Sequence, residues 1–122
     1  MNDNNYGSLD ACKRLLDVGK IQIDTDFCWF ERETDDWIIL PSDDVSIKAI
    51  KDNHAYPAVC MAEAWRELQK YLAQRPDCLP YIRLVAEKDD TIVEAPFMSA
   101  TFSNTNPTDS LIDLLIWIRS QK

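Results

Sequence analysis

Residues 27–40 read FCWFERETDDWIIL, and this stretch decides the first part of the fold. Residues 27–32 are rich in amino acids that favour β-strands, and residues 37–40 are again apolar before Pro41 ends the run. The polar residues 33–36 between them are typical of a turn. The stretch therefore predicts a β-hairpin, with one strand on each side of the turn.

The same region holds almost all of the net charge of the protein. Residues 24–44 carry eight acids and one base, a net charge of −7, whereas the whole 122-residue chain carries −8. The rest of the chain, with 13 acids and 12 bases, is close to neutral. The charged residues of the stretch are Asp24, Asp26, Glu31, Glu33, Asp35, Asp36, Asp43 and Asp44 against Arg32.

Large aromatic residues lie among these acids, and they allow two interpretations. In the first, Trp29 and Trp37 face the core from paired strands while the acids are solvated at the turns. In the second, some of the aromatic side chains are exposed beside the acids and bind a partner. Consecutive residues of a strand point to opposite faces, so Trp29 and Phe30 cannot both face one core unless the strand is covered on both sides.

The clearest helical pattern comes later in the chain. Met61, Trp65, Leu68 and Leu72 recur at helical spacing, and charged residues occupy the opposite face. Pro57 fits the first turn of this helix and Pro76 ends it. We expect Trp65 and Leu68 to belong to the core.

The remaining segments alternate between helix and strand. A short helix is predicted over residues 9–18, with Ser8 as its N-cap and Gly19 just after its end. Residues 45–50 are predicted to form a third strand or an irregular edge. Residues 81–87 and 91–97 predict a second hairpin around residues 88–90, and residues 99–102 a further strand.

A last helix begins after Asn106 or Thr108 and is apolar over residues 111–118, with only Asp113 interrupting. A helix that is apolar nearly all round is buried on more than one side, so it lies between the sheet and another helix or faces a second subunit. We therefore expect one α+β domain over residues 1–122, with residues 1–6 flexible. Three helices pack on an antiparallel sheet built from the two hairpins.

The composition limits the kinds of binding and catalytic site that the chain can form. The chain has only two glycines, whereas phosphate-cradling loops need several, and His54 is its only histidine. The cysteines Cys12, Cys28, Cys60 and Cys78 match no zinc spacing. We therefore expect no cofactor and no metal, and we assign no catalytic residue. The scattered bases argue against direct nucleic-acid or membrane binding. The lack of an N-terminal signal pattern, together with cysteines that lie in or beside apolar stretches, predicts a cytoplasmic protein.

Several sequence blocks resemble a known group of proteins. The blocks are YGSLxxCKRLLD (residues 6–17), DTDFCW (24–29), YPA (56–58), AWREL (64–68), NPTD (106–109) and LLIW (114–117). Together they are similar to small uncharacterised proteins of prophages and other mobile elements in gut Bacteroidetes. The resemblance runs over most of the chain and implies a phage-like genomic setting and a cytoplasmic location. It implies no activity and no catalytic residues.

Three functions remain open at this point. The first is a non-enzymatic module of the immunity or counter-defence type, which binds a basic protein through the acidic hairpin, with Trp29, Glu31, Glu33, Asp35, Asp36 and Trp37 as the binding residues. The second is a small-ligand binder or minor enzyme, whose pocket between the second hairpin and the helices involves His54, Tyr56 and Cys60. The third is a homodimer through the last helix, with no separate site.

Overall fold

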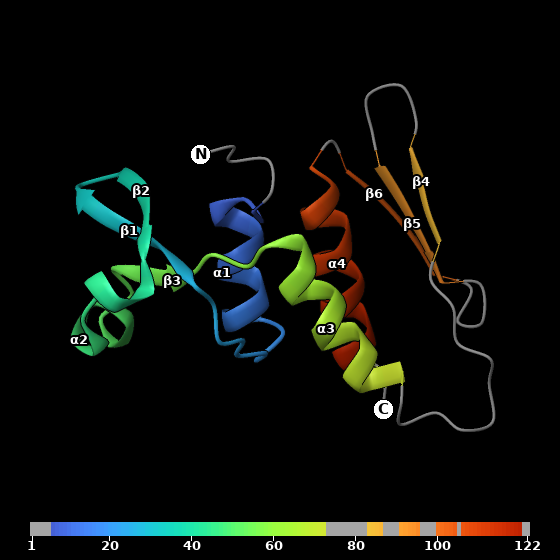
Figure 1. Ribbon diagram of the computed structural model, residues 1–122, viewed down its shortest axis with the longest axis horizontal. Coiled ribbons are helices and arrows are strands. Elements are labelled where there is room, and N and C mark those ends of the chain that lie inside the picture. The colour runs from blue at the N-terminus through green and yellow to red at the C-terminus, as the bar shows by residue number, and fades with distance from the viewer. Residues whose placement is uncertain (1–5, 73–82, 87–90, 96–99, 105, 121–122) are drawn as a thin grey trace.

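A computed structural model of the protein describes residues 6–72, 83–86, 91–95, 100–104 and 106–120. Its elements, in chain order, are α1 (Leu9–Asp17), β1 (Phe27–Glu33), β2 (Asp36–Pro41), the 3₁₀ turn η2 (Ser42–Asp44), α2 (Ile47–Lys51), β3 (Ala55–Pro57), α3 (Met61–Leu72), β4 (Arg83–Ala86), β5 (Thr91–Ala95), β6 (Ala100–Asn104) and α4 (Pro107–Ser120). The long helices lie in the middle, with one small sheet on each side (Figure 1). The expected α+β class is confirmed.

The two predicted hairpins form, but they belong to two separate sheets. The first sheet has the strand order β2-β1-β3 and the second has the order β4-β5-β6, and all neighbouring strands are antiparallel. The single sheet expected from the sequence is therefore wrong in this detail. The helical layer separates the hairpins, because α4 packs against β5 and β6 while α1 contacts β3. The predicted turn at residues 88–90 lies outside the described residues.

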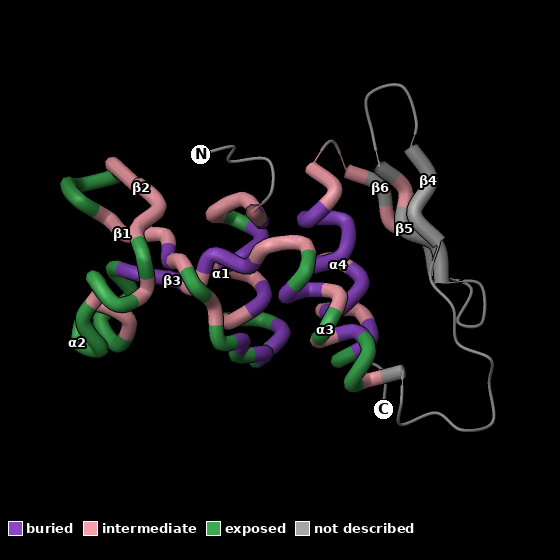
Figure 2. Tube along the Cα trace, in the orientation of Figure 1, coloured by how far each residue is buried: buried purple, intermediate pink, exposed green. Residues whose placement is uncertain are grey.

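The core lies between the helices and the segments that connect them. Leu68 of α3 and Leu111, Ile112, Leu114 and Leu115 of α4 are fully buried. The other members of the cluster are Ala11, Cys12, Leu15, Ile21, Ile23, Val59, Ala64 and Ile118. Figure 2 shows this buried centre along α1 and α4. Since α4 contacts α1, α3, β5 and β6, the expectation that it lies between a sheet and other helices is confirmed.

Helix α1 begins as predicted, because the Ser8 hydroxyl accepts a hydrogen bond from the Ala11 N–H at 3.2 Å. At its other end the left-handed backbone conformation falls on Lys20, with φ 54°, and not on Gly19. Glycine is needed at position 19 for a different reason. A β-carbon there would lie 2.8 Å from the Leu15 carbonyl oxygen, so only glycine allows this close approach.

Two local predictions are wrong. Residues 45–50 form no strand, because the Ser46 hydroxyl accepts from the Ala49 N–H and begins α2 instead. Pro57 does not start a helix. It ends β3, which pairs with β1, and α3 begins only at Met61.

Tyr6, which was expected to be flexible, forms a β-bridge with Cys60, while residues 1–5 lie outside the described part of the chain.

The core assignment of α3 can be tested with Leu68→Ala. Leu68 is fully buried, so its truncation removes apolar contacts and leaves a cavity. We expect the free energy of unfolding to fall by about 2–5 kcal/mol in chemical denaturation. Val18→Ala, at a position that is 68% exposed, serves as the control and should leave the midpoint nearly unchanged. Equal midpoints for Leu68→Ala and the parent would contradict the assigned helix face.

Candidate functional site

The acidic stretch forms most of a separate part of the molecule, which we call the acidic lobe: residues 24–57, comprising β1, β2, η2, α2 and β3. Because Lys48 and Lys51 of α2 and Asp52 just after it lie in this range, the lobe carries nine acids and three bases, a net charge of −6. It projects to one side of the helical layer (Figure 1). No strand residue of β2 is fully buried, and in β1 only Cys28 is.

Four acids gather at the hairpin turn. The Glu31 carboxylate accepts from the Asp35 N–H at 3.1 Å and contacts His54 Nδ1 at 2.9 Å, and these bonds lower the pKa of Glu31, with the His54 contact the larger cause. Asp36 is paired with Arg32 at 2.7 Å. Asp35 adopts a left-handed backbone conformation, φ 60°, which aspartate tolerates better than most residues. Glu33 and Asp35 are exposed and form no ion pair with any described residue.

A second group of acids lies at the opposite end of the hairpin, where β1 begins and β2 ends. The chain closes there through Ser42, whose N–H donates to the Asp26 carbonyl at 2.9 Å and whose hydroxyl donates to the Thr25 carbonyl at 2.7 Å. This group consists of Asp24, Asp26, Asp43 and Asp44. All four are exposed, and none is in an ion pair within the described part of the chain.

The two tryptophans of the hairpin have different surroundings, although both side chains lie on the same face of the sheet. Trp29 packs against the core, and its indole N–H donates to the Gly7 carbonyl at 3.0 Å. Trp37 packs against the Tyr56 ring with 5.9 Å between ring centroids. The Lys13 ammonium lies 4.8 Å from the centre of Trp37 and 5.5 Å from that of Tyr56, which is cation–π geometry.

The structure therefore brings only part of the predicted binding set together. Glu31, Glu33, Asp35 and Asp36 surround the turn, as the hairpin requires. Trp29 faces the interior and holds β1 to the N-terminal segment, so its indole N–H is engaged within the chain. Trp29 therefore faces the core, as the first of the two interpretations of the hairpin aromatics states. Trp37 instead packs against α1 at the edge of the lobe.

The residues of the alternative pocket have separate partners. His54 is exposed and bound to Glu31, and Tyr56 lies in the cluster with Trp37. Cys60 immediately precedes α3, where its N–H donates to the Glu63 carboxylate at 2.9 Å. Burial, the larger cause, and the neighbouring Glu63 raise the pKa of the Cys60 thiol, so this helix end does not favour a thiolate.

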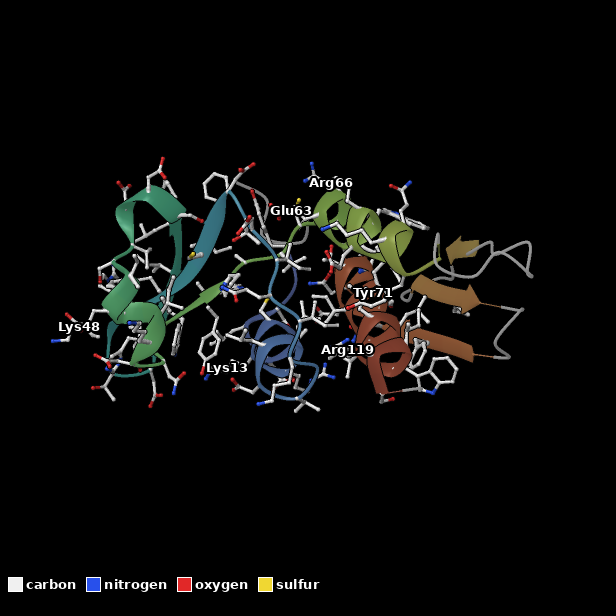
Figure 3. The ribbon with its side chains drawn as sticks, turned by 90° about the horizontal axis from the view of Figure 1, so that it is seen from below. Lys13, Lys48, Glu63, Arg66, Tyr71 and Arg119 are labelled. Atoms are coloured by element: carbon white, nitrogen blue, oxygen red, sulfur yellow. The ribbon has the colours of Figure 1, made fainter. Side chains whose placement is uncertain are left out.

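A polar groove of about 680 Å³ lies elsewhere, between residues 22–26 and α3. It is lined by Gln22, Ile23, Asp24, Asp26, Glu63, Arg66, Glu67 and Lys70. Glu63 is only 5% exposed, and its two oxygens accept from the N–H groups of Cys60 and Asp26. Figure 3 shows Glu63 and Arg66 on neighbouring turns of α3.

Sequence reasoning missed this role of Glu63. A glutamate three residues after a helix cap is the second half of a capping box, and its carboxylate reaches back to the cap N–H. Here the cap position holds Cys60 in place of serine or threonine, so the pattern was not recognised. The spacing between residues 60 and 63 was the available signal.

The described residues contain no group of three or more His, Cys, Asp or Glu side chains arranged to hold a metal ion. Within the same residues, no helix combines the length and apolar character needed to cross a membrane. Comparisons with protein-family models, with curated proteins and with solved structures find no match to this chain.

The different surroundings of the two tryptophans give a direct test. Trp29→Phe removes the hydrogen bond to the Gly7 carbonyl, whereas the Trp37 indole N–H has no hydrogen bond to a described residue. Both substitutions remove similar apolar volume, so Trp37→Phe is the matched control. We expect Trp29→Phe to lower the free energy of unfolding by about 0.5–1.5 kcal/mol more than the control does. Equal losses would mean that the Trp29–Gly7 bond contributes no more than the Trp37 contacts with Tyr56 and Lys13 that the control weakens.

Proposed function

We propose that this protein is a non-enzymatic interaction module, an accessory protein of a mobile element that binds a basic protein in the cytoplasm through the acidic lobe. The observation that most supports this proposal is the position of the negative charge in the structure. Three quarters of the net charge of −8 belongs to one projecting lobe with a net charge of −6, and all other residues of the chain together carry only −2. Immunity proteins and counter-defence inhibitors are the class that this chemistry suits best.

The basic side chains around the hairpin turn support the proposal because they already have partners within the chain, whereas Lys48 and Lys51 lie on α2 and form no ion pair with a described residue. Arg32 is paired with Asp36, His54 contacts Glu31, and the Lys13 ammonium lies over Trp37 and Tyr56. Glu33, Asp35 and the four acids at the base of the hairpin are left to face solvent. Carboxylates without a local counter-charge attract a basic partner and accelerate its association.

Small-ligand binding is the second candidate, and the polar groove beside α3 favours it. Asp24 and Asp26 line one part of the groove, and Arg66 and Lys70 line another. A wall with both signs of charge suits a small polar molecule that itself carries both signs. This site differs from the pocket expected around His54, Tyr56 and Cys60, and it would contain acids that also belong to the lobe.

The proposed role of the turn acids is tested by Glu33→Gln combined with Asp35→Asn. Both side chains are exposed, and asparagine tolerates the left-handed conformation at position 35, so the fold should remain intact. Tagged parent and variant are used to purify partners from the native host. The association rate with the recovered protein is then measured at low and high salt. We expect slower association at low salt and a smaller difference at high salt, because the Debye length falls from about 10 Å at 0.1 M to about 3 Å at 1 M.

The matched control is Asp10→Asn combined with Asp17→Asn, which makes the same change in net charge on α1, outside the lobe. This control should change the association rate much less than the turn variant does. Equal effects of the two variants would mean that only total charge matters, and the lobe would lose its special role. Recovery of no protein partner, with a small molecule retained instead, would favour the second candidate.

A further inference from the structure

Among the described residues no strand pairs with the outer edge of β2, and the backbone groups on that edge can be identified from the register. On β1, the Phe27 carbonyl accepts from Ala58 and the Glu31 N–H donates to His54, so the odd-numbered residues of β1 bond toward β3. The even-numbered residues therefore bond toward β2, as the bond from the Ser42 N–H to the Asp26 carbonyl confirms.

The register then fixes which residues of β2 face outward. Cys28 is opposite Leu40 and Phe30 is opposite Ile38, so the backbone groups of Ile38 and Leu40 point inward to β1. The N–H and C=O groups of Trp37 and Ile39 point away from the sheet. Pro41 adds an outward carbonyl but has no N–H. In the described part of the chain no other strand pairs with this side of β2.

The surroundings of this edge select a particular kind of occupant. No residue of the apolar run is fully buried, so each keeps a minor part of its side chain exposed, and this holds on both faces of the strand. The run consists of Trp37, Ile38, Ile39 and Leu40. Exposed acids stand beyond each end of this apolar run: Glu33 and Asp35 at the turn, and Asp43 and Asp44 after Pro41. A segment that matches has a centre of a few strand-forming residues such as valine and threonine, with lysine or arginine at both ends.

A second copy of this chain matches poorly. Antiparallel pairing of two β2 strands would bring the turn acids of one copy next to Asp43 and Asp44 of the other. Parallel pairing would align identical acids. Either arrangement places like charges across the interface, which disfavours it. A basic partner meets the same edge with favourable charge at both ends.

We propose that the outer edge of β2 binds an extended basic segment of the partner as a fourth strand of the first sheet. In this mode main-chain hydrogen bonds to Trp37 and Ile39 hold the segment, while the flanking acids select lysine and arginine. The inference rests on the proposed function and specifies how the basic partner would bind.

The probe is the synthetic peptide Lys-Arg-Val-Thr-Val-Thr-Lys-Arg, blocked at both ends, titrated into the full chain at low salt. Ile39→Pro removes the outward N–H of residue 39 and leaves the inward bonds of Ile38 and Leu40 in place. Ile39→Val keeps the N–H and is the matched control. Loss of a main-chain hydrogen bond should weaken peptide binding by about 10-fold in Ile39→Pro and by less than about 2-fold in Ile39→Val.

Amide hydrogen exchange in the parent protein gives a second readout that does not depend on the proline variant being folded. Bound peptide should slow the exchange of the Trp37 and Ile39 amides. Binding without slower exchange at these two amides would overturn the edge-strand inference and leave the proposed basic partner standing. No binding at low salt would overturn the inference and also count against the proposed function. If these two amides exchange more slowly as the protein concentration is raised in the absence of peptide, the occupant is a second copy of the chain, and the inference is overturned.

Discussion

The arrangement of this protein depends on a short backbone segment, residues 6–8, which we call the N-terminal junction. The Gly7 N–H donates to the Val59 carbonyl at 2.7 Å, and the Gly7 carbonyl accepts from the Trp29 indole. On the other side, the Ser8 N–H donates to the Asp109 carboxylate at 2.7 Å. A β-carbon on Gly7 would collide with the end of the buried Ile112 side chain, which would have to shift to make room, so glycine at this position lets these elements meet closely. The junction thus joins β1, α1, α4 and the segment before α3.

This junction explains how a charged lobe can project without weakening the core. The buried cluster is made by α1, α3, α4 and their connections, and the first sheet contributes only the partly buried Trp29. In the helical part of the molecule, burial of apolar side chains supplies the stability. The acidic lobe is held by strand pairing, by the Trp37–Tyr56 contact and by local ion pairs. Repulsion among the acids therefore acts on a part of the molecule that contributes little to the buried cluster.

Much of the fold follows from local sequence patterns, and most of what they do not predict depends on contacts between residues far apart in the chain. The α3 periodicity, both hairpins and the Ser8 cap each depend on neighbouring residues, and the structure has all of them. Residues 45–50 were predicted to form a third strand or an irregular edge, but the Ser46 cap, which is itself a local signal, favours a short helix. Pro57 suited a helix start as well as a strand end, and pairing with β1 decided between them. The separation of the two sheets, the burial of Glu63 and the position of Lys13 over two rings all arise from contacts far apart in the chain, which no local pattern contains.

The separation of the acids into two groups also limits what their charge costs the fold. They lie at opposite ends of a seven-residue strand, which spans about 20 Å. Charges that far apart in water are largely screened from each other, because the Debye length at physiological salt is about 8 Å. A partner segment lying along β2 would come within a few ångströms of both groups at once. The two groups therefore repel each other only weakly in the free protein, and both can attract a bound basic strand, which is the arrangement that an electrostatically selected edge strand requires.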